Sequence, residues 1–300
     1  MKSTLQVCLV LILLSTGYLA AQDHAGKGAQ ASDQYVGSET CITCHAPQAK
    51  SFEHGKHWNV ALPGIPKSAG CESCHGPGKA HVESGGDATK IASPKKMSPR
   101  QLSDTCLTCH EASKTHVNFT RSAHIKNNVG CVGCHSVHQS KTSENLLKAS
   151  APQLCYSCHA ETLADFSKPS HHRVNEGLIR CADCHDVHGS PMPHQLRASH
   201  WQQQTCVGCH QDKAGPFQYE HSPVKVEGCT ACHTPHGSSN AHLLTRPNVN
   251  QLCLSCHSEI LATAAPNIPT FHNQAQKYQS CTVCHVAIHG SNTDHVFFRR

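Results

Sequence analysis

The sequence has 300 residues, of which 21 are cysteine and 28 are histidine, while aromatic residues make up only 5% and charged residues 15%. A conventional core needs many more large apolar side chains, so this composition argues against an ordinary α/β enzyme, a coiled coil and a polytopic membrane protein. The formal net charge is +5, but the one basic cluster, PKKMSPR at 94–100, is interpreted as a solvated loop rather than a nucleic-acid site. We therefore expect a bound metal group or cofactor to fill the interior.

The N-terminus predicts a secretory signal peptide over residues 1–21. Lys2 precedes an apolar run at 7–14, and small residues up to Ala21 suit a cleavage site. An uncleaved anchor would need about 20 apolar residues, which this run does not supply. We expect an exported mature chain whose residues 22–40 form a flexible N-terminal segment.

Apart from Cys8 in the signal peptide, every cysteine belongs to one of ten copies of C-x-x-C followed directly by His. Disulfides or zinc ribbons would explain an even number of cysteines, but neither requires a His after every second Cys. Random placement of histidine would give this result with a chance on the order of 10⁻¹⁰. C-x-x-C-H is the attachment motif of c-type haem, in which two thiols bond to the porphyrin and the His reaches the iron.

The motifs therefore predict ten covalently attached c-type haems, each with an iron. The cysteines expected to bind the cofactor are Cys41, Cys44, Cys71, Cys74, Cys106, Cys109, Cys131, Cys134, Cys155, Cys158, Cys181, Cys184, Cys206, Cys209, Cys229, Cys232, Cys253, Cys256, Cys281 and Cys284. The expected proximal iron ligands are His45, His75, His110, His135, His159, His185, His210, His233, His257 and His285.

The sixth ligand of each iron is predicted to be a second His. Only Met97 and Met192 remain after the initiator, too few for ten irons, whereas eighteen His lie outside the motifs. The motifs form five pairs, and each pair offers one His between its motifs and one shortly after the second. The predicted distal ligands are His57, His81, His124, His138, His171, His188, His221, His236, His272 and His289.

Two of these choices have a neighbour that competes with them. His54 competes with His57, and His172 competes with His171. His171 is preferred because the stretch HHRVNEG aligns with HSPVKVEG at His221. Which distal His serves which iron stays open.

The predicted fold is mostly irregular with short α-helices: an elongated multihaem c-type cytochrome built from five two-haem repeats, with the haems forming the core. The repeats lie near 41–90, 106–150, 155–200, 206–245 and 253–290, which makes 41–290 a decahaem wire followed by a tail at 291–300. Leu-rich stretches before three first motifs predict a short helix or turn. The polar stretch Ser84 to Asp104 predicts a loop.

The ten motifs, the segment CESCHGPGKAHVESG around His81 and the recurring pattern seen as GCTACHTPHGS together resemble the decahaem cytochromes of outer-membrane porin–cytochrome electron conduits. The resemblance covers about residues 38 to 292. It implies a periplasmic haem wire associated with the outer membrane and threaded into a β-barrel porin. It also implies an extracellular multihaem cytochrome and periplasmic or inner-membrane donor cytochromes as partners.

We expect an electron-transfer protein, not an enzyme, in which electrons hop from haem to haem. Two alternatives remain open: a soluble periplasmic shuttle that feeds a terminal reductase, and a multihaem reductase with an open iron. The haem propionates would make the loaded protein acidic, at about −6 when oxidised, so we expect no nucleic-acid partner. The direction of electron flow is not predicted.

Overall fold

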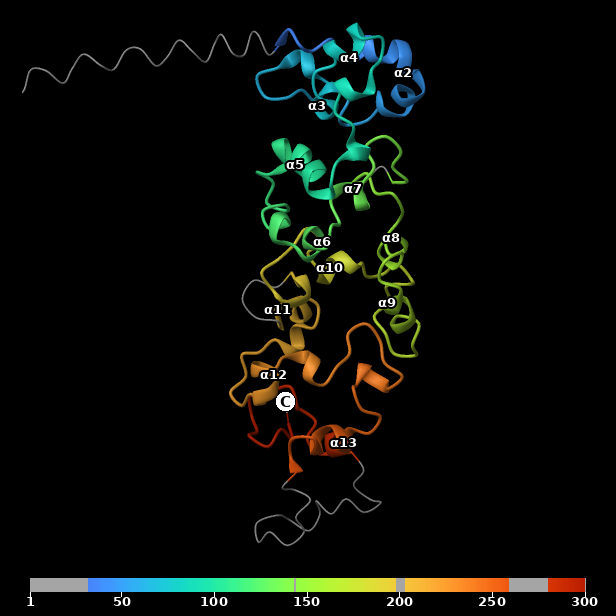
Figure 1. Cartoon of the computed structure of the whole chain (residues 1–300). Helices are drawn as coiled ribbons and strands as arrows, with labels where there is room; N and C mark the ends of the chain where they lie inside the picture. The colour runs from blue at the N-terminus through green and yellow to red at the C-terminus, as the bar shows by residue number, and fades with distance from the viewer. Residues whose placement is uncertain (1–31, 143, 198–202, 259–279, 300) are drawn as a thin grey trace, which may run out of the picture. The chain divides into compact units, whose positions relative to one another are not determined.

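A computed structural model of the chain describes residues 32–142, 144–197, 203–258 and 280–299. In these residues short α-helices and 3-10 turns are joined by loops (Figure 1). The α-helices are α2 (Ser38–Phe52), α3 (Glu72–His75), α4 (Lys79–Glu83), α5 (Pro99–His110), α6 (Ala123–Lys126), α7 (Cys131–Cys134), α8 (Gln153–Tyr156), α9 (Ala160–Asp165), α10 (Cys181–Cys184), α11 (Gln203–Val207), α12 (Ser222–Val226) and α13 (Val249–Leu254). The 3-10 turns are η1 (Pro66–Ser68), η2 (Ala88–Lys90), η3 (Pro94–Lys96), η4 (Phe119–Arg121), η5 (Pro193–Gln195), η6 (Gln211–Lys213), η7 (Cys229–Ala231), η8 (Ala241–Leu243) and η11 (Cys281–Val283).

The described residues contain no β-sheet, and β-type pairing there is limited to isolated bridges. Three of the bridges join the proximal His of a second motif to a downstream Leu: His135 to Leu147, His185 to Leu196 and His233 to Leu244. Mostly irregular chain with short α-helices was predicted, and this part of the fold class is confirmed.

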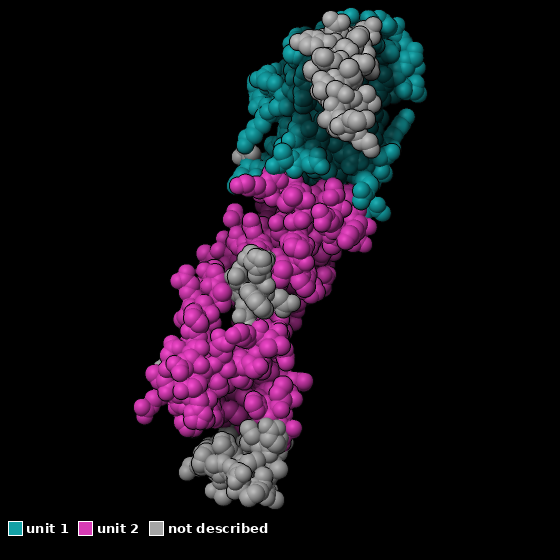
Figure 2. Space-filling model, turned by 90° about the vertical axis from the view of Figure 1, so that its left-hand side faces the viewer, with its two compact units in different colours: residues 1–112, 128–148 teal, residues 113–127, 149–300 magenta. Residues whose placement is uncertain are grey.

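The chain divides into two compact units, which are coloured separately in Figure 2. Unit 1 comprises Met1–Ala112 and Asn128–Lys148, and unit 2 comprises Ser113–Asn127 and Ala149–Arg300. The segment 113–127, which follows the third motif, therefore packs with the later motifs rather than with its sequence neighbours.

The two longest helices each contain the first motif of a pair. In α5, Ser98 and Gln101 form a capping box and Pro99 occupies the first turn, so the sequence fixes where the helix begins. In α2, the backbone leaves the helical conformation at His45 (φ −109°, ψ 33°). The first proximal His therefore stands at a break in its helix.

The three Leu-rich stretches do lead into short helices, α8, α11 and α13, as predicted. The loop predicted for Ser84 to Asp104 is shorter than expected, because the capping box at Ser98 starts α5 inside it. At the ends of the repeat region, part of the N-terminal segment predicted to be flexible and the predicted C-terminal tail both pack against the repeats.

At the N-terminal end, the amide of Lys79 donates to the carbonyl of Gln34 at 3.1 Å, and Tyr35 is buried. At the C-terminal end, Ser291 is buried and pairs with Tyr219 through two backbone hydrogen bonds of 2.8 and 2.9 Å. Residues 34–40 and 291–299 are thus part of the packed structure, because backbone hydrogen bonds tie them to the repeats.

Protein side chains alone form only a small core. Among the described residues the buried apolar side chains are Tyr35, Ala49, Phe52, Phe119, Ile125, Phe166, Val174 and Ala287. None of the helices in the described ranges is both long and apolar enough to span a bilayer.

Candidate haem-binding sites

The first cysteines of the two motifs in a pair lie next to each other. Side-chain hydrogen bonds link Cys41 with Cys71, Cys106 with Cys131, Cys155 with Cys181, Cys206 with Cys229, and Cys253 with Cys281. The hydrogen bond from Cys41 lowers the pKa of the Cys71 thiol to about 6 and raises the pKa of Cys41. Haems attached through these thiols would therefore have neighbouring edges.

Successive pairs are also linked through cysteine, within each unit. The nearby thiol of Cys74 contributes to raising the pKa of Cys106, the first cysteine of the next pair. In unit 2, Cys184 acts in the same way on Cys206, and Cys232 acts on Cys253. Within each unit, the attachment points thus follow one another in space in the same order as along the chain.

In the described residues, eight proximal His are each seen facing a second imidazole across a nearly constant gap. The ring centroids are 6.3 Å apart for His45 and His81, 6.1 Å for His57 and His110, 6.3 Å for His75 and His138, 6.4 Å for His124 and His159, 6.2 Å for His172 and His210, 6.1 Å for His185 and His236, 6.2 Å for His221 and His257, and 6.2 Å for His233 and His289. Two imidazoles bound to one metal ion through bonds of about 2 Å would place their centroids about 6.3 Å apart. These pairs fit a haem iron.

Facing His come from neighbouring motif pairs. The His between the motifs of one pair faces the first proximal His of the following pair, as His57 faces His110 and His221 faces His257. The His after a second motif faces the second proximal His of the preceding pair, as His138 faces His75. The exception is His81, which faces His45 of its own pair. The sequence alone left open which iron each of these His serves.

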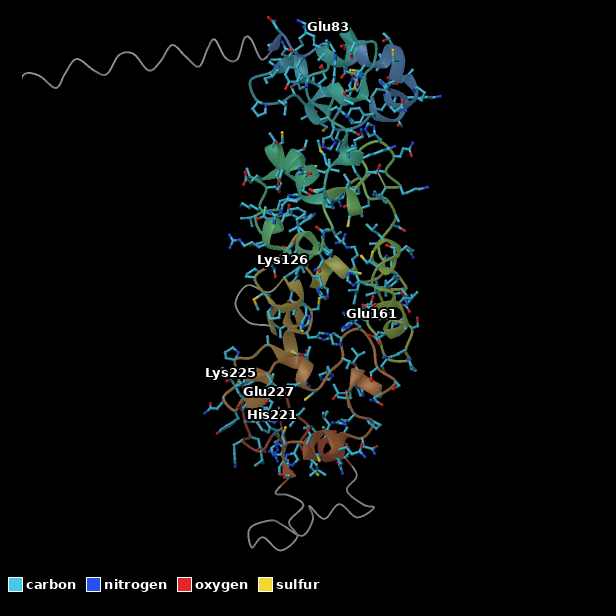
Figure 3. All side chains as sticks on the ribbon, in the orientation of Figure 1. Glu83, Lys126, Glu161, His221, Lys225 and Glu227 are labelled. Atoms are coloured by element: carbon cyan, nitrogen blue, oxygen red, sulfur yellow. The ribbon has the colours of Figure 1, made fainter. Side chains whose placement is uncertain are left out.

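Burial favours the neutral form of several facing His. The pKa values of His57, His138, His221 and His236 are lowered mainly because burial disfavours the charged ring, and secondly because a proximal His stands opposite. His221 directly precedes α12, where Figure 3 labels it together with Lys225 and Glu227. A neutral imidazole is the form that binds a metal ion.

Backbone carbonyls orient the proximal His of all five second motifs. In each of these His, the Nδ1 atom donates to a backbone carbonyl oxygen. The bonds join His75 to Ala92 (3.1 Å), His135 to Asn145 (2.6 Å), His185 to His194 (2.8 Å), His233 to His242 (2.8 Å) and His285 to Val296 (2.6 Å). Because Nδ1 carries the proton, Nε2 is left to bind iron. The histidines His194 and His242 thus contribute their carbonyl oxygens.

Three of the residues that supply these carbonyls, Asn145, His194 and His242, have a left-handed backbone. Asn145 and Leu146 have φ values of 58° and 52°, and His242 and Leu243 have values of 57° and 59°. Such values are uncommon for residues other than glycine. Tertiary packing rather than local preference holds the chain there, so residue types gave little signal for these turns.

Three facing His on the distal side are oriented in the same way. The Nδ1 atom of His81 donates to the backbone carbonyl of Asp87 at 2.9 Å. Likewise, Nδ1 of His124 donates to the carbonyl of Val187 at 3.0 Å, and Nδ1 of His172 to the carbonyl of Pro235 at 2.7 Å. Val187 and Pro235 each directly precede a predicted distal His. One short segment therefore provides an imidazole and orients another.

The structure does not bring His171 to a proximal His. Its Nε2 atom bonds to Glu176 at 2.9 Å and its Nδ1 atom donates to the carbonyl of Lys168. The bond to Glu176 raises the pKa of His171. The neighbouring ring, His172, is the one that faces His210. The geometry therefore favours His172 over the predicted His171.

The predicted distal His also include His188 and His272. The ring of His188 lies 4.3 Å from that of His116, and His272 lies outside the described residues. Of the other proximal His, His285 also contacts the ring of Phe298 at 4.8 Å.

Polar side chains three residues before a first motif bind the second motif of the same pair. Ser38 accepts a hydrogen bond from the amide of Cys71 at 3.0 Å, Ser103 from Cys131 at 3.2 Å, and Asn250 from Cys281 at 3.0 Å. Sequence reasoning missed these residues. Their shared position relative to the first motif was the available signal.

Paired C-x-x-C-H motifs with facing imidazoles define the class of multihaem c-type cytochromes. The family described as doubled CXXCH motif matches residues 124–164, 171–215 and 221–262. The family described as cytochrome c554 and c-prime matches residues 18–76. The first match begins at one facing His, His124, and the third begins at another, His221.

A relative, the multiheme cytochrome MtrA of Shewanella baltica (strain OS185), is 33% identical over 278 residues, covering 89% of this chain and 82% of the relative. The high-molecular-weight cytochrome c of Nitratidesulfovibrio vulgaris (Hildenborough) is 24% identical, covering 85% of this chain and 48% of the relative. The polyheme cytochrome OmcB of Geobacter sulfurreducens is 23% identical over 70% of this chain and 27% of the relative. The chain belongs to the MtrA family of multihaem cytochromes: it carries c-type haem and transfers electrons.

Proposed function

We propose that this protein is a decahaem cytochrome that relays electrons across or up to the outer membrane within a porin–cytochrome conduit for extracellular electron transfer. The observation that carries the proposal is the series of facing imidazoles, 6.1 to 6.4 Å apart, which recurs along the motif pairs. Two His on one iron leave no position for a substrate, which favours electron exchange over catalysis.

The proposed sites use all ten motifs, with two cysteines for attachment and the motif His as proximal ligand. The proposed distal ligands are His57, His81, His124, His138, His172, His188, His221, His236, His272 and His289, with His172 in place of His171. The haems, when bound, supply the centres that take up and release electrons. Within each unit, contacts between the cysteines of successive motifs would fix the order of the haems, and backbone carbonyls orient the imidazoles.

The proposed location is the periplasm, with association to the outer membrane. The signal peptide predicted at residues 1–21 supports export. The proposed partners are an outer-membrane β-barrel porin, an extracellular multihaem cytochrome, and periplasmic or inner-membrane donor cytochromes. The resemblance to conduit cytochromes and the identity of 33% to a multiheme cytochrome of the same family support this assignment.

Fractionation of cells followed by haem staining and detergent co-purification tests the conduit role. We expect the haem protein to travel with an outer-membrane β-barrel protein at a ratio near one to one. Recovery of all the haem protein in the soluble periplasm, without a barrel protein, would contradict the conduit and support a diffusing shuttle. Binding of carbon monoxide by the reduced native protein would reveal an open iron and support a reductase.

A further inference from the structure

The carboxylate of Glu72 is completely buried in unit 1, with an exposed fraction of 0%. It lies in the first turn of α3, inside the second attachment motif, CESCH. Backbone amides surround it: Gly37 and Gly78 each donate to one oxygen at 2.7 Å, and Val36 donates to both oxygens at 3.1 Å. Protein atoms alone therefore enclose this acid and supply its hydrogen bonds.

The contacts of Glu72 suit a negative charge. Every hydrogen bond described for the carboxylate is one that it accepts, and an ionised carboxylate can only accept. Within the described residues no Lys, Arg or His forms an ion pair with it. Amide dipoles stabilise the charge without cancelling it, so its field extends into the surrounding protein.

Glu72 stands where both haems of the first pair attach. It directly follows Cys71, and its charge acts on the thiol of Cys41, which is hydrogen-bonded to Cys71. It also binds the amide of Gly37, the residue that caps α2, the helix with the first motif. The corresponding position in the other pairs holds Val132, Ala182, Thr230 or Thr282, none of which is charged.

We propose that Glu72 is a fixed negative charge that lowers the reduction potentials of the two haems of the first pair. A bis-His haem has one more positive charge when oxidised than when reduced, so a nearby anion stabilises the oxidised form. Electrons that reach the first pair are thereby favoured to move on to other haems. The proposal rests on haem attachment at these two motifs and is independent of the conduit role.

Potentiometric titration of the purified, fully loaded protein tests this role, because it needs no porin. Glu72→Gln removes the charge and nearly keeps the shape, whereas Glu72→Asp keeps the charge. We expect Glu72→Gln to raise the equilibrium constant for reduction about tenfold for two of the ten haems, and Glu72→Asp to leave it near that of the native protein. Glu83→Gln, an exposed acid on α4 labelled in Figure 3, is the matched control and should change nothing.

Two outcomes would overturn the proposal: a titration of Glu72→Gln that matches the native curve, or an equal shift in Glu72→Asp. The second outcome would assign the effect to packing rather than charge. If Glu72→Gln loses haem, redox difference infrared spectroscopy with isotope-labelled glutamate, compared between the native protein and Glu72→Asp, decides the question, because the glutamate bands that the variant lacks belong to Glu72. We expect an ionised carboxylate that responds to haem reduction, and a protonated acid in the oxidised protein would refute a fixed charge.

Discussion

The choice between His171 and His172 depends on a register difference of one residue. Both follow Phe166 at a distance that suits a distal ligand, and the alignment of HHRVNEG with HSPVKVEG pointed to His171. In the folded chain the carbonyl of Pro235 accepts a hydrogen bond from His172, whose ring then faces His210. A contact with a residue 63 positions away decides the ligand, so local sequence could not.

We expect His172→Ala to open one haem. Loss of the ring that faces His210 leaves that iron without its sixth ligand, so the reduced variant should bind carbon monoxide at one haem in ten. The difference spectrum with carbon monoxide measures this directly.

The control is His171→Ala, which removes a hydrogen bond to Glu176 but no facing ring. It should bind no more carbon monoxide than the native protein. Binding by His171→Ala and not by His172→Ala would restore the ligand predicted from the sequence alone.

Among the structural elements, the H-G-S segment packs against the preceding repeat. It consists of the three residues that begin at the His after a second motif. In the fourth pair, His236 of this segment packs on Phe166 of the preceding pair, with ring centroids 5.1 Å apart. Ser238 exchanges two backbone hydrogen bonds with Ser170, at 3.1 and 2.8 Å. A β-carbon at Gly237 would overlap the carbonyl oxygen of Asp165. Glycine is therefore needed here for close approach.

We expect Gly237→Ala to push the segment away from Asp165 and to weaken the contact between His236 and the iron at His185. The overlap should destabilise the protein by about 1–3 kcal/mol, as overpacking does elsewhere. A lower midpoint of thermal unfolding and carbon monoxide binding at one reduced haem are the expected observations.

Gly177→Ala is the matched control in the same unit. Its β-carbon would meet open space, but the residue has φ +78°, so backbone strain of about 1–2 kcal/mol is the only expected cost. It should lower the unfolding midpoint without opening a haem. An open haem in both variants would show that general destabilisation, not the H-G-S contact, releases the ligand.

At the scale of the whole molecule, the cofactors must replace a core that the side chains do not provide. The buried apolar residues in the described part of the chain are few and scattered over both units. We expect the chain made without haem attachment to be largely unfolded, because burial of apolar surface cannot offset the entropy of ordering the chain. Circular dichroism of the haem-free chain should lack the helical signal of the loaded protein. Equal helical signals would contradict this.

The motif count, the irregular fold with short helices and most of the facing His could be predicted because each depends on local spacing. The partner of each His, the carbonyls of Asn145 and His194, and the buried charge of Glu72 could not, because they arise from contacts between distant residues. The packed ends at 34–40 and 291–299 belong to the same group. Contacts with the repeats order them, such as the backbone pairing of Ser291 with Tyr219 and the ring contact of Phe298 with His285.

The offset between facing His also sets an order of assembly. A chain synthesised from its N-terminus presents His110 after His57, and His138 long after His75. Most repeats would therefore wait for their successor before both irons are closed, and each closure would lock the repeat that came before. The first site is different because His81 of the same pair closes it. Maturation would begin at the first site, which needs no later repeat, and would then proceed from the N-terminus one repeat at a time.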